Sequence, residues 1–187
     1  MSRGDVPVSS GVSEHSRCRH GRPPGHTGRV TASVPPHVCF VCTGNICRSP
    51  MAARVFAEHV RRAGLAGSVR ITSAGMGHWH VGDPADPRAV ASLTAHGYPV
   101  EHVAAQVGDD HLGADLLLAA DRGHLRDLRR MAADPARVRL LRDFDPSAPD
   151  GAEIPDPYYG DGDGFAEVLG MIERSVPGLL DWVREPR

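Results

Sequence analysis

Short apolar runs alternate along the chain with longer segments in which apolar residues recur every three or four positions. The short runs are bounded by turn-forming residues, a pattern typical of buried strands. The run Asp-Leu-Leu-Leu-Ala-Ala is apolar almost throughout, as expected for a parallel strand covered on both faces. The predicted strands are residues 37–41, 69–73, 115–120 and 138–141.

The longer segments have helical spacing and carry helix start signals. Ser49 before Pro50, and Asp86 before Pro87, are predicted N-caps, each followed by a proline at the first helical position, where a missing N–H costs nothing. Pro177 lies inside the last segment and is expected to kink that helix or split it in two. The predicted helices are residues 50–63, 87–96, 122–132 and 165–183, with a short helical turn at 109–112.

Strands that alternate with helices imply right-handed crossover connections. The predicted fold class is therefore α/β: a single three-layer domain, with a four-stranded parallel sheet and helices on both faces. Ligands of such sheets bind beyond the carboxyl ends of the strands. Residues 73–75 are expected to turn out of the second strand. Residues 143–163 hold seven acidic residues and no basic one, with proline and glycine throughout, and are predicted to be loop.

Residues 1–36 differ in composition from the rest of the chain. They include five Pro, five Gly and five Arg, and no Leu, Ile, Phe, Trp or Tyr. Such a segment cannot bury enough apolar surface to offset its ordering entropy, so a disordered N-terminal extension is predicted. The chain of 187 residues is long enough for one domain with a proper core, predicted at residues 37–187.

Charge and cysteine content narrow the classes of partner and compartment. The formal net charge is −2 and no basic stripe is interleaved with aromatic residues, so no nucleic-acid partner is expected. No run approaches the roughly 18 apolar residues of a membrane span, and a signal-peptide core is missing. Four cysteines lie within the first 47 residues, a poor layout for a disulfide framework. A soluble, cytoplasmic protein with no membrane partner is expected.

The stretch from Cys42 to Pro50 carries the candidate chemistry. It joins a predicted strand to a predicted helix, so its backbone amides and the positive end of the helix dipole suit a phosphate-sized anion. Gly44 and Asn45 tolerate the backbone angles that such a loop requires. Arg48 offers a planar fork that can hold two oxygens of the anion. A phosphate-binding loop is therefore predicted after the first strand.

Cys42 lies at the mouth of this loop, where the amides, Arg48 and the Ser49 hydroxyl favour thiolate over thiol. The thiolate is the nucleophile, and its predicted reaction is attack on the phosphorus of a phosphate monoester. Cys39 is interpreted as a buried hydrophobe of the strand. A zinc or redox pair of Cys39 and Cys42 is weighed and set aside, because no second ligand pair follows. No metal and no cofactor are expected.

Three stretches, in order, resemble the motifs of the low-molecular-weight protein tyrosine phosphatases. They are the loop Cys42-Thr43-Gly44-Asn45-Ile46-Cys47-Arg48-Ser49-Pro50, Ser73-Ala74-Gly75 with Trp79-His80-Val81-Gly82, and Asp156-Pro157-Tyr158-Tyr159. The likeness runs from about residue 37 to the end of the chain, and makes residues 37–187 the expected catalytic domain. It implies that substrate is bound by Thr43, Gly44, Asn45, Ile46, Cys47, Ser49, Trp79, Tyr158 and Tyr159.

Asp156 is the candidate general acid. Pro157 restrains it to an extended conformation, two aromatic residues follow, and the family resemblance selects it too. It would first protonate the leaving oxygen and then, as carboxylate, activate water. By resemblance, Tyr158 and Tyr159 border the substrate groove and are sites for a regulatory kinase. Trp79 is expected on the opposite wall, between histidines interpreted as polar loop residues.

The expected activity is that of a protein tyrosine phosphatase, which hydrolyses phosphotyrosine and small aryl phosphates through a phosphocysteine on Cys42. Its implied partners are tyrosine-phosphorylated proteins. Cys47 resembles the family's second cysteine, which can form a reversible disulfide with the nucleophile and so protect it. Two alternatives are an arsenate reductase of the same fold and a non-catalytic phosphotyrosine-binding module. The first needs a further cysteine pair, and no Cys follows Cys47.

Overall fold

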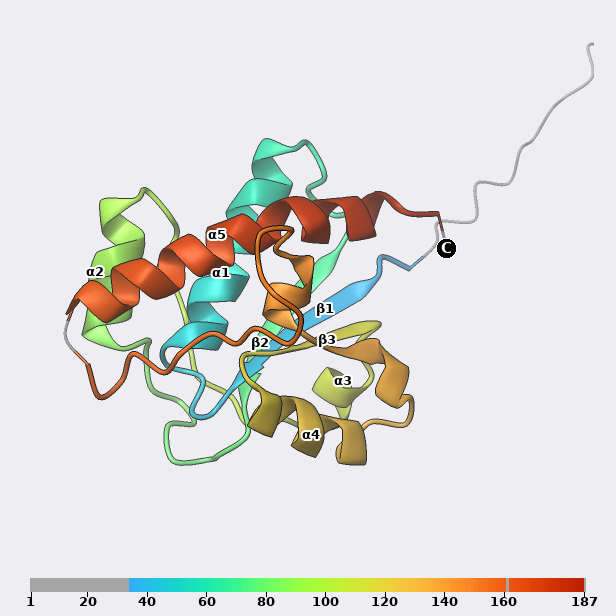
Figure 1. Cartoon of the computed structure of the whole chain (residues 1–187), viewed down its shortest axis with the longest axis horizontal. Coiled ribbons are helices and arrows are strands. Elements are labelled where there is room, and N and C mark those ends of the chain that lie inside the picture. The colour runs from blue at the N-terminus through green and yellow to red at the C-terminus, as the bar shows by residue number, and fades with distance from the viewer. Residues whose placement is uncertain (1–33, 161, 187) are drawn as a thin grey trace, which may run out of the picture. The chain divides into compact units, whose positions relative to one another are not determined.

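The computed structural model describes residues 34–160 and 162–186 (Figure 1). Residues 34–36 lead into the first strand without regular structure. The predicted disordered extension otherwise lies outside the described residues. Residues 37–186 form the elements discussed below.

A four-stranded parallel sheet forms the centre of the fold, as predicted. The strand order is β2-β1-β3-β4, so β1 and β3 are the inner strands. In the register, Val38 lies opposite Ile71 of β2 and Leu116 of β3. The strands are β1 (His37–Cys42), β2 (Arg70–Gly75), β3 (Leu116–Ala119) and β4 (Val138–Leu140).

Helices cover both faces of this sheet, which gives the predicted three layers (Figure 1). They are α1 (Arg48–Arg62), α2 (Pro87–Ala95), α3 (Asp109–Leu112), α4 (Arg122–Met131) and α5 (Gly162–Arg184), with short 3-10 helices at Pro135–Arg137 and Leu141–Phe144. Asp86 caps α2 as predicted, because its carboxylate accepts a hydrogen bond from the amide of Arg88. No described helix is long and apolar enough to cross a membrane.

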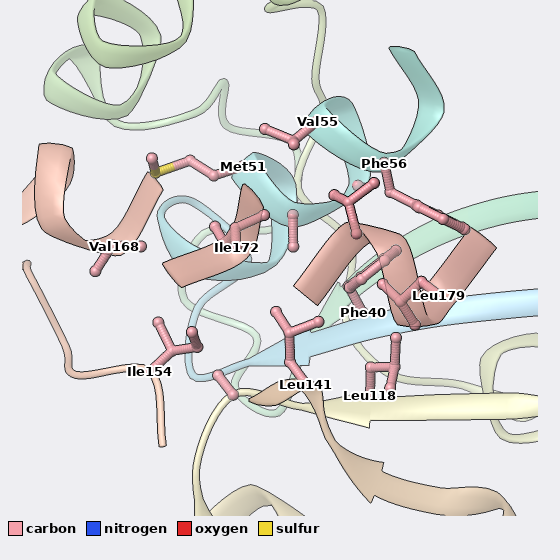
Figure 2. Packing of buried hydrophobic residues seen from close by; sticks show 14 of the residues in the cluster. Phe40, Met51, Val55, Phe56, Leu118, Leu141, Ile154, Val168, Ile172 and Leu179 are labelled. Carbon is pink, nitrogen blue, oxygen red and sulfur yellow. The ribbon is translucent and has the colours of Figure 1, made fainter. Parts of the chain in front are cut away.

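Alternate residues of the inner strands enter two separate cores, because side chains of a strand point to opposite faces. Phe40 and Leu118 pack with residues of α1 and α5 on one face, as Figure 2 shows. Cys39 and Leu117 pack on the other face with Leu128 of α4. Since the inner strands β1 and β3 are covered on both sides, their near-continuous apolar runs in the sequence are explained.

Two of the predicted boundaries in the first half of the chain are wrong. Ser49 is not the N-cap of α1, since the helix begins at Arg48 and Cys47 is the N-cap. Pro50 is accommodated at the third helical position because the amides of the first turn have no partner within a helix. The expected turn at residues 73–75 is strand, because β2 stays paired with β1 as far as the opposition of Cys42 and Gly75.

Pro177 does not split the last helix, contrary to one of the two outcomes expected for it. The helix α5 is continuous from Gly162 to Arg184. Val176 and Leu179, on either side of the proline, are 2% and 1% exposed. A Cβ on Gly178 would lie 2.5 Å from the carbonyl oxygen of Phe144, so the helix packs closely on the preceding segment here. These contacts hold the helix together although Pro177 removes one hydrogen bond.

Replacing Leu118 by alanine tests the importance of the first core. Leu118 is 1% exposed on an inner strand, so we expect the variant to lose about 2–5 kcal/mol of unfolding free energy, measured by urea denaturation. The control is Val103→Ala, at a side chain 70% exposed, which should change stability by less than about 0.5 kcal/mol. Equal stability of the two variants would contradict the packing described.

Candidate active site

The backbone carbonyls of the loop between β1 and α1 are fixed by donors from other segments. The four pairs are Cys42 with the amide of Met76 (2.9 Å), Thr43 with the amide of Gly77 (2.9 Å), Asn45 with Nε2 of His102 (2.6 Å) and Ile46 with the amide of Asp86 (2.8 Å). Burial lowers the pKa of His102, so the neutral ring carries one proton and donates it to Asn45. The residues that follow β2, the N-cap of α2 and His102 therefore set the orientation of the loop's peptide groups.

The amides of the same loop remain available to a ligand. Within the part of the chain that the structure describes, none of the backbone amides of residues 43–47 donates a hydrogen bond to another protein group. A cavity of about 330 Å³ lies over this loop. It is lined by Cys42, Thr43, Gly44, Ile46, Cys47, Arg48, Trp79, His80, Asp156, Tyr158 and Tyr159. Unpaired amides beside a cavity and a helix N-terminus form an anion-binding arrangement.

Asn45 gives the loop its turn. Its φ of 58° is the only positive value among the non-glycine residues described. The side chain, which is fully buried, donates from Nδ2 to the hydroxyls of Ser49 and Ser73, both at 2.9 Å. Its Oδ1 accepts from the amide of Ala105 at 2.8 Å. These three bonds offset the cost of the left-handed backbone conformation.

Gly75 allows the loop to lie directly on the end of β2. A Cβ at this position would lie 2.9 Å from the carbonyl carbon of Gly44 and 3.0 Å from the nitrogen of Asn45. Both are backbone atoms of the loop, so they could not move aside without moving its peptide groups. The Ser73-Ala74-Gly75 motif thus supports the loop from below.

Cys42 is the last residue of β1 and its side chain meets the hydroxyl of Ser49. The Sγ and Oγ atoms are 2.9 Å apart. Asn45 donates to the same hydroxyl oxygen, so the hydroxyl hydrogen of Ser49 has two acceptors within reach: the sulfur at 2.9 Å and the more distant carbonyl of Ala74 at 3.4 Å. A hydrogen bond donated to sulfur favours the thiolate. Ser49 therefore contacts the sulfur of Cys42 instead of capping α1.

The two other described cysteines have environments that keep them protonated. Burial, with the charge of Asp86 as a second cause, raises the pKa of Cys47 to about 12. Burial also raises the pKa of Cys39 to about 11, and Cys39 lies inside β1 with no exposed surface, as expected. At neutral pH both are thiols, and thiols are poor nucleophiles.

Arg48 is buried beside the cavity, and both of its terminal nitrogens are occupied. Nη1 donates to Oδ2 of Asp121 at 3.0 Å and to the carbonyl of Ile154 at 3.2 Å. Nη2 donates to the hydroxyl of Thr43 at 3.0 Å and to Oδ2 of Asp156 at 2.8 Å. The guanidinium is thus held between two carboxylates, a backbone carbonyl and a hydroxyl.

The two carboxylates differ in surroundings. Asp121 follows β3 and caps α4, with Oδ1 accepting from the amide of His124 at 2.9 Å. Burial alone would raise the pKa of Asp121, but hydrogen bonding from His124 and the charge of Arg48 hold it well below its ordinary range. Asp156 is the more exposed, with 37% of its side-chain surface accessible against 28% for Asp121. Asp121 is therefore a permanent anion, and Asp156 is open to the cavity.

The loop that carries Asp156 is tied down on both sides. The amide of Ile154 donates to the carbonyl of Ala120 at the end of β3, at 2.8 Å. Arg88 donates to the carbonyls of Tyr158 at 3.1 Å and Gly160 at 3.0 Å. The guanidinium of Arg88 lies 5.6 Å from the centre of the Tyr158 ring.

Aromatic side chains form the outer part of the cavity. Tyr158 and Tyr159 meet edge to face, with ring centres 5.1 Å apart. Trp79 stacks on His78, with ring centres 5.7 Å apart, and is 68% exposed. Tyr159 is 91% exposed and Tyr158 is 41% exposed. These rings can meet a flat, apolar group whose polar end reaches the loop.

The structure brings most of the site residues predicted from the sequence to one cavity. Asn45 and Ser49 lie beneath it, and the others line it. Sequence reasoning missed five groups that orient them: Asp86, Arg88, His102, Asp121 and His124. Only Asp121 carried a usable signal, since it directly follows an apolar strand at the ligand-binding edge of the sheet. No group of three or more His, Cys, Asp or Glu side chains suited to a metal ion occurs in residues 34–160 and 162–186.

The fold and site define a class of protein: an α/β domain whose first strand ends in an oxyanion-binding loop with a cysteine at its mouth. The family model of the low molecular weight phosphotyrosine protein phosphatases matches residues 37–187. The chain therefore belongs to this family, as the resemblance of its motifs implied.

Several known proteins are similar to this chain. Low molecular weight protein-tyrosine phosphatase A of Mycobacterium bovis is 58% identical over 154 residues, which cover 82% of this chain and 94% of that protein. A low molecular weight protein-tyrosine-phosphatase of Streptomyces coelicolor is 54% identical over 153 residues, with 79% and 93% covered. The crystal structure of YfkJ from Bacillus subtilis superposes with a TM-score of 0.74 at 34% identity, with 80% and 95% covered.

The variant Gly75→Ala tests the support beneath the loop. Because the added Cβ would meet the backbone of Gly44 at 2.9 Å, we expect the loop to shift and inorganic phosphate to bind at least about tenfold more weakly, measured by calorimetry. Gly108→Ala is the control, since a Cβ there meets nothing within 4 Å. Unchanged phosphate affinity in Gly75→Ala would show that the loop tolerates displacement.

Proposed function

We propose that this phosphatase hydrolyses phosphotyrosine and small aryl phosphates through a phosphocysteine intermediate on Cys42, with Asp156 as general acid and base. The observation that carries the proposal is the loop itself. Its carbonyls are fixed by donors elsewhere while the amides of residues 43–47 are unpaired beside the sulfur of Cys42. Residues 37–187 are the proposed catalytic domain.

In the first step, the phosphate of the substrate occupies the cradle and the thiolate of Cys42 attacks the phosphorus. An S–P bond forms while the bond from phosphorus to the phenolic oxygen breaks. The amides of the loop stabilise the charge on the three equatorial oxygens, which is the main contribution a protein makes to phosphoryl transfer. Thr43, Gly44, Ile46 and Cys47 contribute to the cradle through their backbone.

Binding of phosphate requires an exchange at Arg48. Nη2 of Arg48 is bonded to Asp156, and a phosphate oxygen competes for the same donor. Displacement of Asp156 removes the cation that stabilises its ionised form, next to an incoming dianion that also disfavours a second negative charge. A protonated Asp156 beside the leaving oxygen is the consequence, and it is the general acid of the first step.

In the second step, the carboxylate of Asp156 takes a proton from water, and the water oxygen attacks the phosphocysteine. The S–P bond breaks, inorganic phosphate leaves, and the thiolate of Cys42 is restored. The same residue thus acts as acid and then as base, as microscopic reversibility permits. Every group in this cycle is a residue of the chain.

The outer cavity favours an aromatic leaving group. Ring stacking against Trp79, Tyr158 or Tyr159 is worth about 0.5–1.5 kcal/mol per pair. The loop contributes Ile46, an apolar side chain, to the same cavity. The proposed partners are therefore proteins phosphorylated on tyrosine, which present a phosphate at the end of a phenyl ring.

Two further roles rest on the same residues. Cys47 is the proposed partner of Cys42 in a protective disulfide. Its thiol must lose a proton when it attacks oxidised Cys42, so the raised pKa makes this step slow at neutral pH.

Tyr158 and Tyr159, which are 41% and 91% exposed, are proposed substrates of a regulatory kinase. The described cysteines are all free thiols, which suits the cytoplasm as the proposed compartment.

The variant Cys42→Ser tests the nucleophile. A hydroxyl is far less nucleophilic than a thiolate, so turnover of p-nitrophenyl phosphate should fall by roughly 10⁴-fold or more, while inorganic phosphate still binds. Arg48→Ala should lose both turnover and phosphate binding. A Cys42→Ser variant that keeps most of its activity would rule out the phosphocysteine. Phosphate binding by a wild-type protein with no turnover would instead favour the non-catalytic binding module.

The variant Asp156→Ala tests the general acid. Loss of a positioned acid typically costs about 10²–10⁴-fold in rate, and the cost should be largest for esters of poor leaving groups such as phenol and smallest for good ones such as p-nitrophenol. The kcat values for a series of aryl phosphates measure this dependence. Asp150→Ala, at an exposed carboxylate of the same segment, is the control and should behave as wild type. Equal losses across the series would remove Asp156 from this role.

A further inference from the structure

His124 is a buried histidine that contacts the catalytic loop, and none of the steps above uses it. It is the third residue of α4 and is 8% exposed. Its Nε2 lies 3.0 Å from the hydroxyl oxygen of Thr43, the residue that follows the nucleophile. Its Nδ1 lies 3.0 Å from Oδ2 of Asp121. The ring therefore bridges the phosphate-binding loop and the carboxylate behind Arg48.

The contacts around Thr43 favour one arrangement of its hydrogen bonds. Arg48 can only donate, so the hydroxyl oxygen of Thr43 accepts from Nη2. The hydroxyl hydrogen is then free to be given to another acceptor, and Nε2 of His124 stands at hydrogen-bond distance. On the other side of the ring, Asp121 is a carboxylate and favours a proton on Nδ1. With its proton on Nδ1, the ring presents Nε2 to Thr43 as an acceptor, while Nδ1 lies at ion-pair distance from Asp121 without hydrogen-bond geometry.

These contacts close a ring of four side chains. Arg48 donates to Thr43 from one terminal nitrogen and to Asp121 from the other, and His124 joins Thr43 to Asp121 from behind. Every member of the ring is held by two others. Rotation of the Thr43 hydroxyl, or of the guanidinium about its last torsion, therefore breaks contacts on both sides.

The ring matters when substrate is present. Nη2 of Arg48 has two hydrogens, one given to Thr43 and one to Asp156. Phosphate takes the place of Asp156, and the contacts that then keep the guanidinium in its plane are those to Thr43, Asp121 and Ile154. Without His124, Thr43 would lose its second partner and could turn its hydroxyl hydrogen toward Nη2, which repels it.

We propose that His124 is a positioning residue: by accepting the hydroxyl hydrogen of Thr43, it keeps the oxygen of Thr43 turned toward Arg48 and so holds the guanidinium in line with the transferring phosphoryl group. The proposal rests on the phosphatase reaction proposed above. His124 itself touches neither the substrate nor the reacting atoms.

The test compares His124→Ala, His124→Asn, His124→Gln and Thr43→Val with wild type. A side-chain amide at the end of Gln reaches the place of Nε2, whereas that of Asn reaches only the place of Nδ1. We expect kcat for aryl phosphates to fall about tenfold in His124→Ala, His124→Asn and Thr43→Val, with KM changed less than about twofold. His124→Gln should recover most of kcat. His96→Ala, at an exposed histidine of another helix end, is the matched control.

A double-mutant cycle tests whether His124 acts through Thr43. If it does, His124→Ala combined with Thr43→Val should have about the kcat of either single variant. Losses that multiply, a kcat of His124→Ala within twofold of wild type, or recovery by Asn but not by Gln would each overturn the proposal. Thermal unfolding of each variant identifies any loss that follows from misfolding, and His124→Gln and Thr43→Val nearly preserve volume for that reason. Turnover by wild type reports separately on the phosphatase reaction itself.

Discussion

The orientation of five peptide groups after β1 is the constraint on which the rest of the site depends. A carbonyl turned into the cavity would repel a phosphate, and an amide turned away would be lost to it. The structure fixes four of the five carbonyls with donors drawn from three other segments, after β2, at the start of α2 and at His102. The left-handed residue this requires, Asn45, is stabilised by three hydrogen bonds of its own side chain. The fold thus orients these peptide groups before any ligand binds.

Beside the cavity, one cation lies between two anions. Arg48 faces Asp121 and Asp156, so an incoming phosphate meets an excess of negative charge unless one carboxylate withdraws or takes a proton. Asp121 cannot, because its hydrogen bonds and the charge of Arg48 hold its pKa low. Asp156 can withdraw, since its side chain is the more exposed of the two. In the proposed mechanism, Asp121 is therefore the anchor of Arg48 and Asp156 is the acid, although the two residues are of the same type.

Local sequence patterns predicted the order of strands and helices, the parallel sheet and the loop after β1, because apolar runs, N-caps and prolines act over a few residues. One local rule, the N-cap rule, failed where the site overrides it. Ser49 has the sequence context of an N-cap, but its hydroxyl is taken up by Cys42 and Asn45. Contacts that join distant segments could not be predicted at all: nothing near His124 in the sequence indicates that it meets Thr43 across the end of the sheet.

The hydrogen bonds that hold the loop of Asp156 determine which groups must move in the proposed mechanism. Ile154, two residues before Asp156, is bonded to the end of β3, and the carbonyls of Tyr158 and Gly160 are bonded to Arg88. With both flanks held, the exchange of Asp156 for phosphate at Arg48 needs rotation of one short side chain, not closure of a loop. Side-chain rotation at a partly exposed position takes picoseconds to nanoseconds, far less than a typical enzyme turnover. In the proposed mechanism, this exchange is therefore too fast to limit turnover.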